Sequence, residues 1–341
     1  MAHDIIVIGA SAGGVQPLGK IIERLKPDFA GSVFIVLHVS GYSMLPSILA
    51  KAGRLAAEHA KDGQPIKPGK ILIAPPDHHL LLNDHRVLLS RGPKQNNVRP
   101  AIDVLFLSAA RMFGPRVIGV VLSGSLDDGS AGLVAIKRAG GIAIVQNPED
   151  AVHRDMPCNA IAAIQADYIL PASEIGPALN ELSSSNGRAE GSMVKQAKPS
   201  QRMKMIARGE SDPTVLPKGK ISTLTCPECG GTLWEAHEGK VLRFHCHTGH
   251  SFSAGTMLET QQNGVETALW VALRTLKERA VLLNKLAGEA RRGHRRFTER
   301  KYTEDAKEFE QRAELLREVL MSRWPKPSRP ALKSRRTSKR R

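Results

Sequence analysis

The 341-residue sequence predicts an α/β fold with a doubly wound, mostly parallel sheet, followed by a small cysteine-containing module and a helical hairpin. Three observations support this prediction. Short β-branched runs alternate with alanine-rich segments of helical period up to residue 182, three of the four cysteines fall within 224–252, and two long segments of helical period follow. Alternating strands and helices favour a parallel sheet with helices on both faces.

The individual elements of the first part follow from its apolar runs and turn residues. We expect strands at 4–8, 32–37, 70–74, 86–90, 116–122, 142–145 and 168–170. We expect helices at 14–25, 43–52, 100–113, 129–139, 159–164 and 173–182. Asn83-Asp84-His85 between two apolar runs predicts a hairpin embedded in the same sheet.

Changes in composition divide the chain into successive segments. They are an α/β domain over 1–182, a flexible linker rich in Ser, Gly, Lys and Pro over 183–220, a zinc-ribbon-like module over 221–255, a helical hairpin over 256–321 and a basic, disordered tail over 322–341. Apolar residues of the hairpin recur at alternating spacings of four and three. This stripe is expected to pack within the hairpin or to form a dimer seam, so self-association through these helices is one expectation.

The charge of the chain is concentrated at one end. The sequence has 49 Lys and Arg against 33 Asp and Glu, a net charge of +16 with neutral His, and nine of these basic residues lie in 322–341 without any acid. A solvated tail explains this excess. With 4% aromatic residues there is little stacking surface for bases, so we expect no specific nucleic-acid binding.

Apolar runs in the sequence are too short for membrane insertion. No run approaches the roughly 18 apolar residues that a spanning helix needs. The amino-terminal segment also has no basic region ahead of its apolar run, so it does not resemble a secretory signal. The expected location is cytoplasmic and reducing.

The first predicted strand runs into Gly9-Ala10-Ser11-Ala12-Gly13-Gly14 and then into a helix. A dinucleotide-binding turn would need glycine at the position of Ser11 and an acid at the end of the second strand, where this chain has His38. A nucleophilic serine on a sharp strand-to-helix turn fits the small flanking residues. A phosphate-binding or helix-capping role for Ser11 remains open at this point.

Two further candidates follow the ends of other predicted strands. His38 comes directly after the strand at 32–37, and Asp127-Asp128 follow the strand at 116–122. Carboxyl ends of parallel strands share one edge of a sheet, where open α/β sheets place their sites. A base-activated hydroxyl needs Ser and His within hydrogen-bond reach, with an acid to orient the imidazole. Capping of the following helix is the alternative for either aspartate.

Together these motifs carry a family resemblance that covers the chain from Ile5 to about Leu182. The stretch resembles the catalytic domain of the chemotaxis protein-glutamate methylesterases, the CheB family. The matching motifs are Gly9 to Gly14 with Ser11, Leu37-His38-Val39, and Leu122 to Gly129 with Asp128. Supporting segments are Ile73-Ala74-Pro75-Pro76-Asp77, Arg99 to Phe106, Gln146-Asn147-Pro148 and Met156-Pro157.

The resemblance implies a serine hydrolase that removes methyl esters from glutamate side chains of methyl-accepting chemoreceptors and releases methanol, without a catalytic cofactor. Ser11 would be the nucleophile, His38 the base and Asp128 the acid that orients it, with backbone amides near Ala12 and Ser125 as oxyanion donors. Receptor glutamine deamidation is a related alternative.

Two departures from the family pattern stand out. The chain begins at the catalytic strand, so we expect no control by aspartyl phosphorylation of a receiver domain within it. The family's Met-Gly pair before the aspartates is replaced by Ser125-Leu126, which puts a branched residue where glycine is usual.

Three of the four cysteines, together with a histidine, suggest a metal site. Cys226 and Cys229 form a C-x2-C pair, and Cys246 and His250 follow after sixteen intervening residues with C-x3-H spacing. This spacing predicts a structural Cys₃His zinc site, with His237, His245 and His247 as alternative fourth ligands.

A similar extension, with its Ala268-Leu269-Trp270 helix, occurs in some stand-alone members of the same family. We expect it to dock the esterase onto a receptor array or another signalling partner. A catalytically impaired zinc-ribbon scaffold that binds nucleic acid or a signalling partner is the alternative function.

Overall fold

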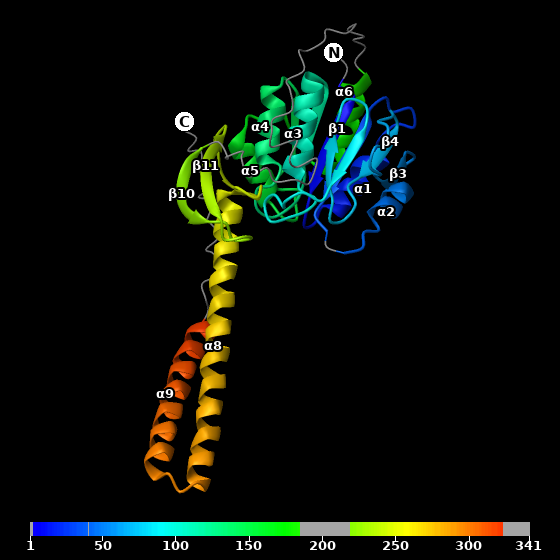
Figure 1. Ribbon diagram of the computed structural model, residues 1–341. Coiled ribbons are helices and arrows are strands. Elements are labelled where there is room, and N and C mark those ends of the chain that lie inside the picture. Colours follow the sequence, from blue (N-terminus) through cyan, green and yellow to red (C-terminus); the bar gives the residue numbers. More distant parts are fainter. Residues whose placement is uncertain (1–2, 40, 185–218, 323–341) are drawn as a thin grey trace, which may run out of the picture. The chain divides into compact units, whose positions relative to one another are not determined.

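The computed structural model describes residues 3–39, 41–184 and 219–322 (Figure 1). The chain divides into two compact units, one up to Thr260 and the other from Gln261 onward. Most of the expected linker over 183–220 and nearly all of the expected basic tail over 322–341 lie outside the described residues. Within the described residues, no helix is long and apolar enough to cross a membrane.

The first unit is built on a seven-stranded sheet in the order β3-β4-β2-β1-β7-β8-β9, and every neighbouring pair is parallel. The strands are β1 (Ile5–Ala10), β2 (Ser32–Leu37), β3 (Ala56–His59), β4 (Lys70–Ile73), β7 (Val117–Val121), β8 (Ile142–Gln146) and β9 (Tyr168–Leu170). Strand β1 pairs with β2 on one side and with β7 on the other. The strand order therefore reverses at β1, the kind of switch point where such sheets place their sites.

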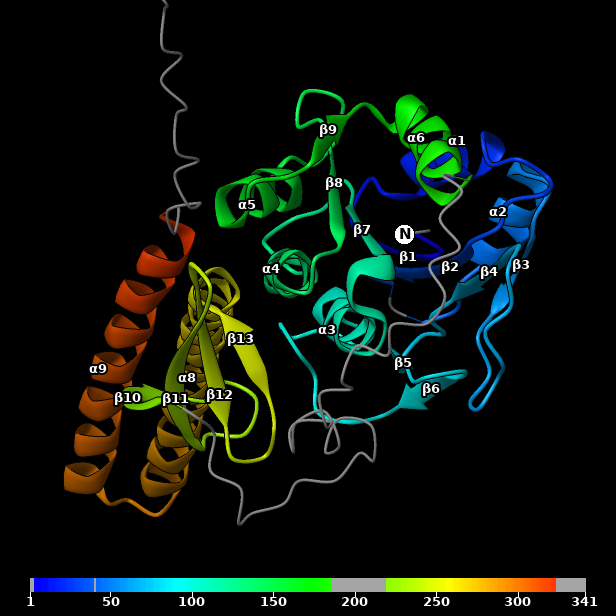
Figure 2. The same cartoon turned by 90° about the horizontal axis from the view of Figure 1, so that it is seen from above.

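Helices cover both faces of this sheet (Figure 2). One face carries α1 (Val15–Glu23), α2 (Leu45–Ala52) and α6 (Ala172–Ser184), and the other carries α3 (Ile102–Phe113), α4 (Ser130–Arg138) and α5 (Asp155–Ala163). A short 3₁₀ turn, η1 (Gly114–Arg116), joins α3 to β7. Central strands β1 and β2 are buried along their whole length, as expected for a sheet covered twice. The predicted doubly wound α/β fold is confirmed.

Two features of the sheet differ from the sequence-based expectation. The hairpin of β5 (His79–Leu82) and β6 (Val87–Ser90) forms a separate antiparallel sheet rather than part of the main one, because its apolar side chains pack in the core beside α3. The edge beside β4 is taken by β3, which was not predicted. Its sequence, Ala-Ala-Glu-His, has no β-branched residue, and its place is set by parallel pairing with β4.

A small antiparallel sheet belongs to the same compact unit. Its strands are β10 (Lys220–Thr225), β11 (Thr232–Glu238), β12 (Val241–Cys246) and β13 (Ser251–Ser253), and we call it the ribbon. Its core consists of a few residues around Leu233, Phe244 and Phe252. So small a core provides limited stability without a further constraint such as a metal.

The second unit contains most of α8 (Ala254–Arg292) together with α9 (Arg296–Met321). Small residues are buried on both helices of this unit. They are Ala280 and Ala287 of α8 and Ala306 and Ala313 of α9. Polar contacts across the pair include Asn284 Nδ2 to Glu310 Oε1 at 3.0 Å. Part of the apolar stripe therefore packs within the hairpin, while self-association through these helices stays a prediction.

Candidate active site

Ser11 stands on a sharp turn between β1 and α1. Its amide donates to Ser123 O at 3.0 Å, and Gly14 N donates to Ser11 O at 2.9 Å. Gly13 adopts a φ of +73°, which favours glycine, so the chain reverses immediately after the serine. The turn leaves Ser11 partly accessible at the carboxyl edge of the sheet.

His38 follows β2, the neighbour of β1, and it links two of the predicted residues. Its Nδ1 lies 3.2 Å from Ser11 Oγ, and its Nε2 lies 2.9 Å from Asp128 Oδ2. The side chain is 14% exposed, whereas the Asp128 side chain is 4% exposed. With Nε2–H donating to Asp128, Nδ1 is free to accept the Ser11 proton. The structure therefore brings together the three residues selected from the sequence.

The Asp128 carboxylate is held by the amino-terminal end of α3. Ile102 N donates to Oδ2 at 2.7 Å and Asp103 N donates to Oδ1 at 3.1 Å, while Asn96 Nδ2 donates to Oδ1 at 2.8 Å. Burial by itself would raise the pKa of Asp128, but the hydrogen bond and charge of His38 and the Ile102 and Asn96 donors lower it to about 2. The carboxylate is therefore ionised at neutral pH.

Capping of α4, the helix that follows them, does not account for the side chain of either aspartate. The residue that caps α4 is Gly129, and the carboxylate that accepts the Gly132 amide at 2.8 Å is that of Asp103. Asp127 Oδ1 accepts a hydrogen bond from Ser253 Oγ of the ribbon at 2.6 Å. Asp128 instead faces α3 and His38.

The loop that precedes Asp128 runs close to the serine. A Cβ placed on Gly124 would lie 2.8 Å from Ser11 Cβ and 2.1 Å from Met156 Sδ, so this position accepts no side chain. Two residues later, Leu126 adopts a φ of +63°, a conformation that favours glycine. The backbone thus keeps the glycine-type conformation although the sequence places leucine there.

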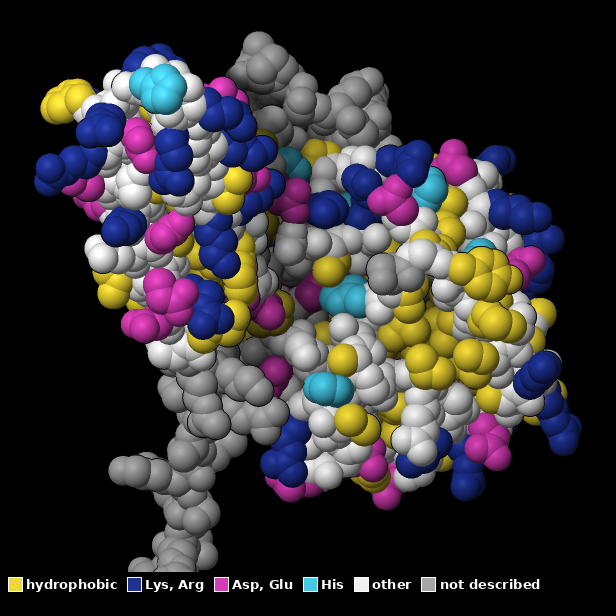
Figure 3. Space-filling view, turned by 90° about the horizontal axis from the view of Figure 1, so that it is seen from below, with side chains coloured by type: hydrophobic (Ala, Val, Ile, Leu, Met, Phe, Trp, Pro, Cys, Tyr) yellow, Lys and Arg dark blue, Asp and Glu magenta, His cyan; other side chains and the backbone are white. Residues whose placement is uncertain are grey.

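A surface pocket lies beside His38. Its volume is about 510 Å³, and its walls include Val39, Asp77, Arg99 and Pro100. Asp77 accepts hydrogen bonds from Arg99, with Nη2 to Oδ1 at 2.6 Å, which fixes one wall. Figure 3 views the molecule from below and shows histidine side chains near a broad gathering of apolar ones.

Comparison with known proteins identifies this arrangement. The family model described as CheB methylesterase matches residues 6–179. The chain belongs to the CheB methylesterase family. The solved catalytic domain of Thermotoga maritima CheB methylesterase is 36% identical with a TM-score of 0.51, and the match covers 53% of this chain and 100% of that one. Residues 6–179 are therefore a methylesterase domain.

Two curated relatives carry the same double name. Protein-glutamate methylesterase/protein-glutamine glutaminase 2 of Anaeromyxobacter dehalogenans is 38% identical over 181 residues, 52% of this chain and 53% of that protein. The second relative, named as a putative protein-glutamate methylesterase/protein-glutamine glutaminase of Leptospira interrogans, is 37% identical over 189 residues. The match covers 54% of this chain and 98% of that protein. The chain thus spans about half of the first relative and nearly all of the second.

Outside the methylesterase domain, the predicted metal ligands converge. The ligand atoms of Cys226, Cys229, Cys246 and His250 all lie within 4.8 Å of one another. The Sγ atoms of Cys229 and Cys246 are 3.8 Å apart, and His250 Nδ1 is 3.5 Å from Cys246 Sγ. Tetrahedral zinc with Zn–S bonds of about 2.3 Å separates its sulfur ligands by about 3.8 Å. The donor set and its spacing fit zinc.

The other candidate histidines lie outside this group. His247 stacks edge-on against Trp234, with ring centroids 5.5 Å apart. His237 is exposed on β11, and neither it nor His245 is among the converging ligand atoms. The Thr248 hydroxyl does reach the cluster, 3.0 Å from Cys246 Sγ.

Three buried residues of the site were not selected from the sequence. Asn96 and Asp103 both contact Asp128, and Arg243 of the ribbon pairs with Asp103. Asp103 lies in a segment that carries the family resemblance, which was the available signal for it. No spacing pattern marks Asn96 or Arg243, because their partners are distant in sequence.

Proposed function

We propose that this chain is a serine esterase that removes methyl groups from glutamate side chains of methylated chemoreceptor proteins. The observation that carries the proposal is the hydrogen-bonded series of Ser11, His38 and Asp128 at the carboxyl edge of a methylesterase domain. The names of the curated relatives support the reaction. The resemblance described above supports chemoreceptors as the class of substrate.

In the first half of the reaction, His38 acts as general base. Its Nδ1 takes the proton of Ser11 Oγ while the oxygen attacks the carbonyl carbon of the methyl ester. The imidazolium that forms is stabilised by the ionised Asp128 at Nε2. Collapse of the tetrahedral intermediate transfers the proton from Nδ1 to the leaving methoxy oxygen, so methanol departs and a glutamyl ester of Ser11 remains.

In the second half, the same groups act on water. His38 Nδ1 takes a proton from water, the resulting hydroxide attacks the acyl carbon, and the proton returns to Ser11 Oγ as the glutamic acid side chain leaves. That acid then releases its remaining proton to solvent and becomes the carboxylate. The oxyanion forms beside the turn that follows Ser11. In the described residues, the Ala12 and Ser125 amides have no acceptor of their own, which makes them available to it.

Deamidation of protein glutamine is a second candidate, favoured by the second activity in the relatives' names. An amide carbonyl would meet the same Ser11 and form the same acyl-enzyme, with ammonia leaving in place of methanol. The two activities therefore share one nucleophile and are distinguished by the released product.

Methanol release from a methylated receptor fragment tests the proposal. We expect release by the wild-type chain and a loss of at least about 1,000-fold in Ser11→Ala, since removal of a triad serine can lower kcat by about 10⁶-fold. Ser173→Ala changes an exposed serine of α6 and is the matched control. Equal release by wild type and Ser11→Ala would overturn the assignment of the nucleophile, and a small generic ester separates a wrong protein substrate from an inactive site.

We also propose that the four converging ligands of the ribbon hold a structural zinc ion. Four protein ligands close the coordination shell, so the metal would stabilise the fold rather than activate water. The small core of the ribbon supports this role, since metals commonly stabilise modules of this size. Thiolate ligands require reduced cysteines, which is in keeping with the expected reducing compartment.

A further inference from the structure

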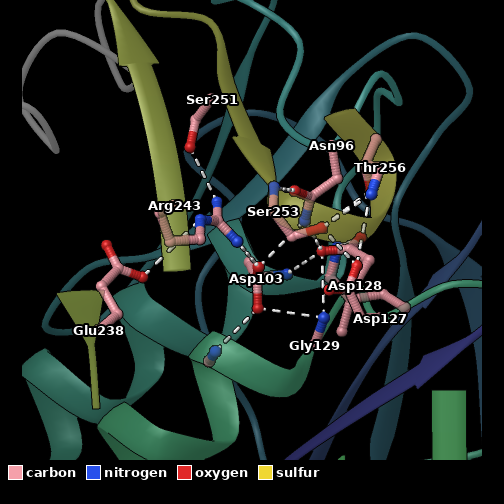
Figure 4. Close-up of polar contacts among 12 residues, drawn as sticks. Asn96, Asp103, Asp127, Asp128, Gly129, Glu238, Arg243, Ser251, Ser253 and Thr256 are labelled. Atoms are coloured by element: carbon pink, nitrogen blue, oxygen red, sulfur yellow. Dashed lines mark hydrogen bonds and ion pairs between the residues drawn. The ribbon is translucent and has the colours of Figure 1, made fainter. Parts of the chain in front are cut away.

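The surroundings of Asp128 include residues of the ribbon, which lies beyond the family match at 6–179 (Figure 4). Asp103, Asp128 and Asn96 are buried together, and these residues are 1%, 3% and 4% exposed, respectively. One amide nitrogen, Asn96 Nδ2, donates to Asp103 Oδ2 at 3.0 Å and to Asp128 Oδ1 at 2.8 Å. The orientation of Asp128 is thus linked to that of Asp103.

The ribbon determines which way the Asn96 side chain faces. Ser253 N of β13 donates to Asn96 Oδ1 at 3.0 Å, and Asn96 N donates to Ser251 O at 2.6 Å. Because the amide oxygen is engaged by Ser253, its nitrogen must face the two carboxylates. The ribbon backbone therefore fixes the donor that bridges them.

Arg243 of β12 supplies the positive charge. Its Nη1 forms an ion pair with Asp103 Oδ2, and its Nη2 donates to Ser251 Oγ at 2.9 Å. The Arg243 side chain is 2% exposed and the Asp103 side chain 1%, and 140 positions separate them in the sequence. A cation buried to this degree acts on its neighbours with little screening by solvent.

Charge balance explains why a cation is needed at this point. Two neighbouring carboxylates that share one amide donor repel each other in a buried site. Burial and the Asp128 charge raise the pKa of Asp103 and the charge of Arg243 lowers it, so that with Arg243 in place the pKa is about 7. Without that charge, the pKa of Asp103 would rise further, so Asp103 would hold a proton more tightly or draw the Asn96 donor away from Asp128. Either change alters the support of the carboxylate next to His38.

We propose that Arg243 is a positioning residue, which acts through Asp103 and Asn96 to hold the Asp128 carboxylate toward His38, so that the ribbon completes the active site of the methylesterase domain. This inference rests on the proposed function. Arg243 reaches neither Ser11 nor His38 in the contacts of the described residues, so its effect falls on the chemical step rather than on substrate binding.

Steady-state kinetics on the full chain test this role. We expect Arg243→Met to lower kcat at least tenfold with KM changed by no more than about threefold, because the loss affects the transition state and leaves ground-state binding in place. Arg243→Lys keeps the charge beside Asp103 and should retain kcat within about threefold of wild type. Lys240→Met removes an exposed charge from the same ribbon and is the matched control.

Arg243→Gln covers the case in which Arg243→Met does not fold. Glutamine keeps a donor for Asp103 without the charge, so we expect it to match Met in kcat while circular dichroism and the melting temperature report the fold. Values of kcat within twofold of wild type in the neutral variants would overturn the inference. An increase in KM at unchanged kcat would also overturn it, since that result would place the ribbon in substrate binding.

Covalent labelling of Ser11 by a fluorophosphonate separates this inference from the proposed function. We expect the wild type to be labelled, Ser11→Ala not to be labelled, and Arg243→Met to be labelled at least tenfold more slowly. Absence of labelling in the wild type would overturn the proposed function and this inference together. Equal labelling rates in wild type and Arg243→Met would overturn the inference alone.

Discussion

Asp128 accepts backbone hydrogen bonds from the start of α3, the helix that contains Asp103, and Asp103 accepts backbone hydrogen bonds from the start of α4, the helix that follows Asp128. Asp128, just before α4, accepts the Ile102 and Asp103 amides at the start of α3. Asp103, in the first turn of α3, accepts the Gly129 amide at 3.0 Å and the Gly132 amide of α4. Both helix ends thereby meet a negative charge, which favours each helix dipole. The exchange joins two helices at the residue that orients His38.

The first prediction concerns the acid itself. Asp128→Asn should lower kcat for methyl ester hydrolysis by about 1,000-fold to 10,000-fold, since an uncharged partner no longer favours the imidazolium. Methanol release at saturating substrate measures the effect. A loss of less than tenfold would contradict the role of Asp128.

A second prediction follows from the lowered pKa of Asp128. A carboxyl group whose pKa falls from 3.8 to about 2 on folding stabilises the native state above pH 4, and this contribution disappears as the pH falls toward 2. The free energy of unfolding of the wild type should therefore lose about 2 kcal/mol more than that of Asp128→Asn between pH 5 and pH 2. Urea unfolding at both pH values measures the difference, and parallel curves for the two proteins would contradict it.

The third prediction uses the backbone conformation at Leu126. At a φ of +63° glycine carries no Cβ penalty, whereas alanine keeps the strain and loses the leucine contacts. Leu126→Gly should be more stable than Leu126→Ala by about 1 kcal/mol, the reverse of the usual order of these residues. Chemical unfolding of the two variants compares them, and the usual order would show that the loop relaxes out of this conformation.

The fourth prediction concerns the space beside the nucleophile. Gly124→Ala should lower kcat more than tenfold and destabilise the fold by about 1–3 kcal/mol, because the new methyl group meets Ser11 and the Met156 sulfur. Gly19→Ala is the matched control, since a Cβ at that helical position has no neighbour within 4 Å. It should keep full activity and gain stability. Full activity in Gly124→Ala would show that the loop can move away from Ser11.

The fifth prediction concerns the metal. Elemental analysis should find one zinc per chain in the wild type, and Cys226→Ser should lower both the zinc content and the melting temperature. Cys158→Ser, which changes a cysteine outside the cluster, should keep the metal. Chelation should also slow labelling of Ser11, because the ribbon carries Arg243 and Ser253. Unchanged zinc content in Cys226→Ser would contradict the ligand set.

The sequence alone was sufficient for the fold class and for selecting the residues that converge at the two sites. Alternating strands and helices are local periodic features, and Ser11, His38 and the pair Asp127-Asp128 each follow a strand whose carboxyl end lies at a shared sheet edge. The family resemblance then selected Asp128 from that pair. Cysteine spacing is local as well, so the cluster around Cys226 could be proposed from it. Such patterns are visible because each depends on neighbours a few positions away.

Only the tertiary structure revealed how these parts are connected. The place of β3 depends on its pairing with β4, and the separate hairpin depends on packing beside α3. The pairing of Arg243 with Asp103 joins residues 140 positions apart. A lone arginine on a strand resembles any exposed charge in sequence. Its burial against a carboxylate is decided by how the ribbon packs on the α/β domain, a long-range contact that no local spacing encodes.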